Sequence, residues 1–405
     1  MLQTAKWFII LLLSTLSMLA QDTFTNRENS QYTFKTLKNL EATPIENQSY
    51  SGTCWSFSSL SFLESEILRL TNKEVNLSEM YVVRNAYLGK AENYLRMNGH
   101  SNFAQGGAFH DALWVWKHYG MMPEHEYMGL NYGYDKHNHS ELEIVLKSLV
   151  ESFNKKTMKD QLTTNWKEIY TGVVDSYLGH LPADVHKHTF TIDGRTYTPF
   201  TYAESLGLNP DDYISLTSFT HHPFYEPFVI EIPDNWNMKS SYNLPLDELM
   251  SVLEQAIMSG YSFAWGADVS EKGFSARDAL AIVPEDEATV KEKGKGELYF
   301  TDEDDKKINN AFMIPGKEKL VSQDERQHAF DVQTTTDDHG LHATGIVEDQ
   351  NGTKYFVMKN SWGTEHNDRG GYFYASFPYV RYKTISVYIH KDALPKQLRK
   401  KLGIK

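Results

Sequence analysis

The chain has 405 residues, of which 40% are hydrophobic and 13% aromatic, so it can bury a sizeable core and is not a disordered chain. The formal net charge of −13 disfavours broad nucleic-acid binding, which normally requires a basic excess. Cys54 is the only cysteine, which excludes an intramolecular disulfide and any multi-cysteine metal site.

The first twenty residues have the pattern of an export signal. Lys6 precedes an unbroken apolar run from Trp7 to Leu13, and small or apolar residues continue to Ala20. We therefore predict a signal peptide over residues 1–20 and a periplasmic or secreted protein that does not associate with the membrane after cleavage. A membrane anchor is the alternative, although the run is shorter than the roughly 18 to 20 apolar residues that a span needs.

The next segments predict a polar arm and then a helical subdomain. Residues 21–38 are polar and are expected to form an N-terminal arm. Apolar periodicity predicts helices over Thr53–Leu70, after a cap at Ser78, and over 107–119 with Gly120 as the terminating residue. Residues 39–120 therefore form the predicted helical subdomain.

The rest of the chain changes from helices to strands. Residues 121–245 are predicted to be a helical and irregular insertion, followed by a β-rich subdomain over 246–392 and a basic C-terminal arm over 393–405. The predicted strands are His342–Val347, Lys354–Lys359, Gly371–Ala375 and Thr384–His390. Because the helices come first and the strands last, the order favours an α+β fold with an insertion.

Cys54 has a sequence context that favours chemistry over simple burial. A free thiol is ionised to only a small extent at neutral pH, and the N-terminus of a helix stabilises the thiolate. Cys54 stands at the predicted start of a helix, and Gly52 lets the backbone turn into it.

Three dispersed motifs carry a family resemblance. The segment from Gln48 to Phe57, which includes Cys54-Trp55, resembles the active-site segment of papain-like cysteine peptidases. Residues 337–343 (DDHGLHA) and 359–363 (KNSWG) resemble the histidine and asparagine segments of the bleomycin hydrolase/aminopeptidase C branch, which lacks disulfides. The resemblance implies a papain-like fold with a central cysteine helix and an antiparallel, barrel-like β domain.

The resemblance also implies catalytic roles. Cys54 would be the nucleophile and His342 its base, Asn360 would orient the imidazole, and Gln48 with the Cys54 backbone N–H would hold the oxyanion. Trp362 would shield the histidine–asparagine bond beside the substrate. His339 is the weaker base candidate, because in an extended segment its side chain lies on the opposite face from that of His342.

The spacing and the remaining motifs refine the resemblance. The interval from Cys54 to His342 exceeds the papain spacing by about 140 to 160 residues, which fits the insertion of this branch. Gly106 and Gly107 resemble glycines that line the substrate cleft. The terminal carboxylate of Lys405 would bind the free amine of a substrate, and a homo-oligomer, a hexamer in this branch, is implied.

The predicted function is that of a cysteine aminopeptidase acting on peptides, with no cofactor and no metal, because the close histidine pairs form no H-E-x-x-H motif. An endopeptidase with the same triad is the first alternative. An inactive peptide-binding homologue and an acyltransferase on the same scaffold are the others.

Overall fold

The computed structural model describes residues 23–155, 161–290 and 310–405. The predicted signal peptide over 1–20 lies outside these ranges. Within them, no helix has the length and apolar character needed to cross a membrane.

The first three helices follow the predicted periodicity. They are α1 (Cys54–Thr71), α2 (Glu79–Arg96) and α3 (Phe109–Tyr119). The side chain of Ser78 caps α2 by accepting a hydrogen bond from the Tyr81 backbone N–H. Gly120 ends α3 with a positive φ of 73°, in a position where an added Cβ would collide with the backbone of Pro199.

Further helices complete both halves of the molecule. They are α4 (Ser140–Asn154), α5 (Trp166–Leu178), α6 (Pro199–Ser205), α7 (Leu246–Met258), α8 (Gln323–Asp331), α9 (Phe377–Lys383) and α10 (Lys396–Lys401). The helices α1 to α6 contribute to one large apolar core, whereas α7, α9 and α10 pack against the sheet.

Within the described residues, twelve strands form one sheet and two form a separate hairpin, β3 (Phe190–Ile192) with β4 (Arg195–Tyr197). The sheet contains β1 (Thr23–Phe24), β2 (Phe34–Asn39), β5 (Tyr213–Thr217), β6 (Pro227–Val229), β7 (Ser240–Asn243), β8 (Phe263–Ala267), β9 (Phe274–Ser275), β10 (Leu280–Ala281), β11 (His339–Glu348), β12 (Lys354–Lys359), β13 (Tyr372–Ser376) and β14 (Thr384–His390). The central strand β11 pairs with β8, β12 and β2.

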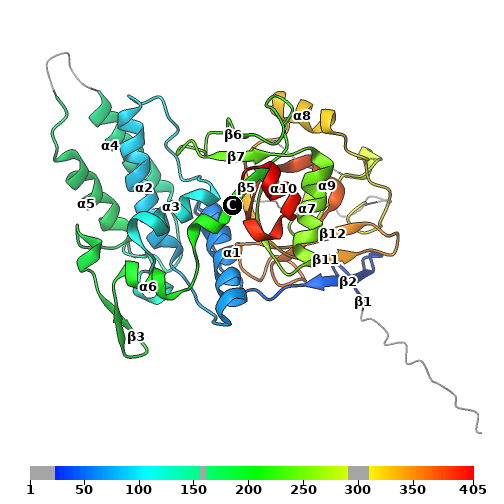
Figure 1. The fold of residues 1–405 in the computed structure, drawn as a ribbon, viewed down its shortest axis with the longest axis horizontal. Coiled ribbons are helices and arrows are strands. Elements are labelled where there is room, and N and C mark those ends of the chain that lie inside the picture. Colours follow the sequence, from blue (N-terminus) through cyan, green and yellow to red (C-terminus); the bar gives the residue numbers. More distant parts are fainter. Residues whose placement is uncertain (1–22, 156–160, 291–309) are drawn as a thin grey trace, which may run out of the picture.

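The molecule has a helical half and a sheet half. Figure 1 shows α2 to α6 on one side, the sheet on the other, and α1 at the boundary between them. Helix α1 contacts both halves. Leu60 and Leu63 pack within the helical core, whereas Ser58 and Ser61 face β11. The predicted α+β fold is confirmed, and its architecture places Cys54 at this boundary.

Three features differ from the sequence-based expectations. The predicted N-terminal arm is part of the sheet, because Tyr32 and Phe34 are buried among Tyr355 and Tyr374. The last part of the predicted insertion contributes β5, β6 and β7 to the same sheet. The sheet is mixed rather than antiparallel, since β5 with β7 and β10 with β13 run parallel, each joined by a crossover longer than a hairpin turn.

Candidate active site

Cys54 is the first residue of α1, and the residue is partly buried at the boundary between the two halves. The preceding turn is held by a 2.6 Å hydrogen bond between the hydroxyls of Ser51 and Thr53. The indole Nε1 of the neighbouring Trp55 donates to the Gln105 carbonyl at 3.0 Å. These contacts fix the thiol at the positive end of an 18-residue helix, where a thiolate is stabilised.

Gln48 is buried between the cysteine turn and the segment after Asn360. Its Nε2 donates to the Ser51 carbonyl at 2.7 Å, and its Oε1 accepts from the Ser361 hydroxyl at 2.6 Å. Its backbone N–H also donates to the Ser361 carbonyl at 2.8 Å. Because an amide nitrogen carries two protons, one N–H of Gln48 remains for a group beside Cys54.

Asn360 orients His339, not His342. The Nε2 of His339 lies 2.7 Å from Asn360 Oδ1, which also accepts the Ser361 backbone N–H at 2.9 Å. Two donors on Oδ1 identify it as the carbonyl oxygen of the amide. The indole of Trp362 covers this bond, with its ring centre 4.7 Å from that of His339. The predicted contact between His342 and Asn360 is therefore wrong.

His342 lies on the other face of β11, in the interior. Its side chain is fully buried, its Nδ1 is 2.9 Å from the Ser61 hydroxyl, and its ring packs edge-on against Phe62. Burial, followed by the positive charge of Lys359, lowers the pKa of His342 well below its ordinary value. His342 is a neutral core histidine rather than a neighbour of the Asn360 amide.

A β-bulge explains why His339, and not His342, lies on the face of β11 that carries Asn360. From the turn at Asn351-Gly352, Val347 pairs with Tyr355 and Gly345 with Val357 in a regular ladder. Continued without interruption, this ladder would place His342 opposite Asn360. The register instead shifts between Ala343 and Gly345, so that His342 pairs with Lys359. One extra residue moves every preceding side chain by one position, and His339 shares the face of Asn360.

The backbone of β11 connects this imidazole to the thiol. Burial raises the pKa of Cys54 to about 12, and the backbone N–H groups of Gly340 and Trp55, which point at the sulfur, act in the opposite direction. Gly340 directly follows His339, and a Cβ there would lie 2.6 Å from the Ser58 hydroxyl of α1. The strand can approach the start of α1 this closely because the residue is glycine.

The protonation of the pair follows from its surroundings. Burial lowers the pKa of His339 to about 4, against the smaller opposite effects of Asn360 and Asp338. Burial therefore disfavours both a thiolate at Cys54 and an imidazolium at His339 when either is charged alone. Since Asn360 Oδ1 can only accept, Nε2 of His339 carries the proton in the neutral ring, which leaves Nδ1 as the basic nitrogen.

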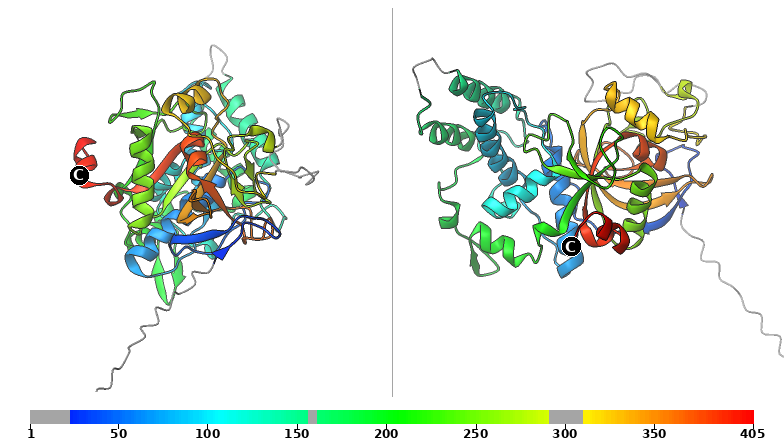
Figure 2. Two further views of the ribbon diagram at one scale, coloured as in Figure 1. Left: turned by 90° about the vertical axis from the view of Figure 1, so that its right-hand side faces the viewer. Right: turned by 45° about the horizontal axis from the view of Figure 1, so that its top comes forward.

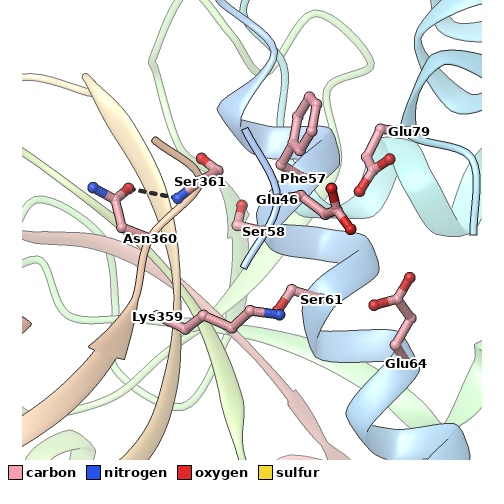
Figure 3. A pocket seen from close by; sticks show the side chains of 9 residues that line it. All are labelled: Glu46, Phe57, Ser58, Ser61, Glu64, Glu79, Lys359, Asn360 and Ser361. Atoms are coloured by element: carbon pink, nitrogen blue, oxygen red, sulfur yellow. Dashed lines mark hydrogen bonds between the residues drawn. The ribbon is translucent and has the colours of Figure 1, made fainter. Parts of the chain in front are cut away.

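A small cavity beside Asn360 is lined by several charged and polar side chains. Figure 3 shows Lys359 reaching from β12 towards α1, with the carboxyl groups of Glu46, Glu64 and Glu79 around the same space. Burial raises the pKa of Glu64 to about 7, although its oxygens accept from the Leu77 N–H and the Thr43 hydroxyl. This layer supports the strand end that carries Asn360.

The remaining predicted site residues have other neighbours. An added Cβ on Gly106 would lie 1.9 Å from the carboxylate of Asp234, and one on Gly107 would meet Trp55 and Asp111. Lys405 is exposed, and Figure 2 shows the C-terminus at the edge of the molecule. The arm before it is anchored to the sheet half, where Leu398 and Leu402 are buried and Lys401 lies on the ring of Tyr225.

One cluster has the donor atoms of a metal site. The Nε2 atoms of His221 and His222 lie 3.1 and 2.9 Å from the two oxygens of Glu231. These three groups are the described residues whose donor atoms converge closely enough to hold an ion. They are partly or fully exposed, and the carboxylate already bridges the two rings by hydrogen bonds.

The fold and this arrangement define a papain-like protein. The family model described as papain family cysteine protease matches residues 30–188, the part of the chain that contains Gln48 and Cys54, in agreement with the resemblance of the motifs. Aminopeptidase G of Lactobacillus delbrueckii subsp. lactis is 22% identical over 403 residues, covering 89% of this chain and 83% of the relative.

Two further comparisons concern a short stretch of sequence and the fold. Human cathepsin L2 (Homo sapiens) is 34% identical over 68 residues, covering 14% of this chain and 20% of the relative. The crystal structure of PepW from Lactobacillus rhamnosis superposes with a TM-score of 0.67 at 18% identity, covering 91% of this chain and 84% of that chain. The structural similarity shows that the fold is shared along nearly the whole chain.

Proposed function

We propose that this papain-family peptidase is an aminopeptidase that uses Cys54 as nucleophile and His339, rather than His342, as general base. The observation that supports this assignment is the 2.7 Å bond from His339 Nε2 to Asn360 Oδ1, beside the Gly340 amide that points at the Cys54 sulfur. His339 acts as catalytic residue and Asn360 as its positioning residue.

The proposed reaction follows from this geometry. His339 Nδ1 takes the thiol proton as the Cys54 sulfur bonds to the substrate carbonyl carbon, and the carbonyl oxygen becomes an oxyanion. The free Gln48 N–H and the Cys54 backbone N–H donate to that oxyanion. The C–N bond then breaks as His339 protonates the leaving amine. Water, deprotonated by His339, finally cleaves the thioester, which releases the acid and restores the thiol.

The central experiment is replacement of the nucleophile. The Cys54→Ala variant should fold normally and lose peptidase activity on a mixed peptide pool analysed by mass spectrometry, because no other cysteine exists in the chain. Cys54→Ser is the matched control, which keeps a hydrogen-bonding group at the helix end. Activity at the wild-type level in either variant would contradict the mechanism.

Removal of single residues from the N-terminus is the second part of the proposal. It is supported by the similarity to aminopeptidase G along 89% of the chain. An endopeptidase with the same residues is the alternative, and the peptide pool separates the two: stepwise shortening from the amino end indicates an aminopeptidase, whereas internal fragments indicate an endopeptidase. Export by the predicted signal peptide and assembly into a homo-oligomer are part of the same proposal, tested by the N-terminal sequence and molar mass of the mature protein.

A further inference from the structure

A loop from the sheet half crosses to the helical half next to Cys54. We call residues 230–239, between β6 and β7, the strap. Its base is fixed, because Val229 pairs with Ser240 and the Asn235 side chain bonds to the carbonyls of Ile230 and Lys239. Figure 1 shows β6 and β7 extending towards α2 above the boundary of the two halves.

The far end of the strap is anchored on α2 and α3. The indole Nε1 of Trp236 donates to the buried carboxylate of Asp111 at 2.8 Å, and its ring packs edge-on against Trp114. Asn93 Nδ2 donates to the Trp236 carbonyl at 2.9 Å. Trp236 is 7% exposed, so this end is a packed contact rather than a loose loop.

The strap places a carboxylate directly on Gly106. The Asp234 oxygen lies 1.9 Å from the position of an added Gly106 Cβ, so it occupies the space that the glycine leaves open. Gly106 follows Gln105, whose side chain accepts the Gly52 N–H at 2.7 Å just before Cys54. The negative charge of Asp234 is close enough to the thiol to raise the pKa of Cys54.

A second carboxylate faces this position from the sheet half. Asp337, two residues before His339, also raises the pKa of the thiol, and its own pKa is raised well above the ordinary value by burial and then by the charge of Asp234. The ammonium of Lys90 is buried and donates to the carbonyls of Ala104, Gln105 and Gly106. Burial raises the pKa of Asp234, and the charge of Lys90 acts in the opposite direction. One side of Cys54 is therefore bounded by the strap and holds two carboxyl groups and one ammonium group.

We infer that the strap limits the substrate to a single residue on its acyl side, and that Asp234 and Asp337 bind the free α-ammonium group of that residue. A chain continuing past the acyl residue would meet the strap, whereas an ammonium group would sit between two carboxylates. The inference rests on the proposed function and gives the specificity role to an internal loop rather than to Lys405.

The test compares substrates with free and blocked amines. We would measure kcat and KM of the full-length protein on an aminoacyl fluorogenic amide, on its N-acetyl form and on a desamino acyl form. In the Asp234→Asn variant, kcat/KM for the substrate with a free amine should fall by about tenfold or more, mainly because KM rises. The values for the N-acetyl and desamino substrates should change little. Asp337→Asn should act in the same direction. Asp135→Asn, an exposed aspartate away from the strap, is the matched control.

The outcomes separate this inference from the proposed function. If the wild-type protein cleaves none of these substrates and Cys54 does not react with iodoacetamide, the proposed function fails. If the wild-type protein is active but Asp234→Asn leaves the preference for the free amine unchanged, the inference fails and the peptidase assignment stands. An equal loss on all three substrates also overturns the inference, because it would show a structural role alone.

A shortened strap provides a second, independent test. Replacing residues 230–239 by Asn-Gly joins Val229 to Ser240 through the two-residue hairpin that their pairing allows. This variant should cleave N-acetylated peptides at internal positions, with at least about a tenfold gain over the wild type, which measures the steric block. The melting curve shows whether the variant is folded. If a folded variant still does not cleave N-acetylated peptides, the proposed role of the strap is contradicted.

Discussion

The two faces of β11 give two histidines opposite roles. His339 meets an amide oxygen and an indole at the boundary of the molecule's halves, whereas His342 meets a serine hydroxyl and Phe62 in the interior. Both are buried, and burial lowers the pKa of each. The difference shows that burial alone does not make a base. What separates the two rings is the partner: His339 bonds to the Asn360 amide, which fixes its tautomer, and His342 bonds to the Ser61 hydroxyl.

The strongest test removes each ring in turn, beginning with His339. His339→Ala should lower kcat/KM by on the order of a thousandfold, since it removes the proton acceptor of Cys54. Its melting temperature should remain near that of the wild type. Steady-state kinetics and labelling of Cys54 by iodoacetamide check this. Full activity in His339→Ala, or its loss in a folded His342→Ala variant, would reverse the assignment.

The next largest effect concerns the orienting amide. Asn360→Ala should lower kcat/KM by about ten- to a hundredfold while KM changes little, because the imidazole remains but loses its fixed tautomer. Asn360→Asp keeps an acceptor and should retain more activity than the alanine variant. An alanine variant as active as the wild type would show that the 2.7 Å bond has no role in turnover.

On the interior face, the expected effect is on stability. His342→Ala should lower the free energy of unfolding by about 1 to 3 kcal/mol, because it leaves a cavity beside Phe62 and an unpaired Ser61 hydroxyl. Denaturant unfolding measures this quantity. The variant should retain most of its activity at low temperature, where it stays folded.

The smallest effect is a change in the pH dependence of stability. Glu64 has a folded-state pKa of about 7, raised by burial, so between pH 4.5 and 7 the folded protein holds a proton that the unfolded chain releases. Its contribution to stability therefore falls as the pH rises through this window, by about 1.4 kcal/mol per pH unit at most. Glu64→Gln should gain stability relative to the wild type from pH 5 to pH 8, measured by thermal melting. A stability difference between Glu64→Gln and the wild type that stays the same from pH 5 to pH 8 would contradict the raised pKa of Glu64.

Local patterns were sufficient to predict most elements that carry the site. The apolar repeat after Thr53 predicts α1, the Ser78 cap predicts the start of α2, and the strands β12 and β14 have the predicted bounds. Cys54, Gln48 and Asn360 are placed by motifs within a few residues of a helix start or a strand end. Such signals depend on short stretches of chain, and tertiary packing preserves them.

Two features depended on pairing between distant segments. The bulge at Thr344 changes which histidine faces Asn360, and nothing in the alternation of residues 342–347 marks the extra residue. The glycine pair that includes Gly106 indicates that some group approaches the backbone closely. The sequence does not indicate that this group is the Asp234 carboxylate. The strap also lies in a segment without helical or strand periodicity. Register and loop docking are settled by contacts that a single sequence does not display.

The bonds of Gln48 have a mechanical consequence. One side chain ties the turn before Cys54 to Ser361, next to the residue that orients His339. Any hinge motion that separated the helix start from the end of β12 would break these bonds of Gln48. Under the proposed mechanism, it would displace the oxyanion donor and the imidazole in the same step. Partly opened conformers would thus have no activity rather than reduced activity. The overall turnover rate would then be proportional to the fraction of molecules that are fully closed.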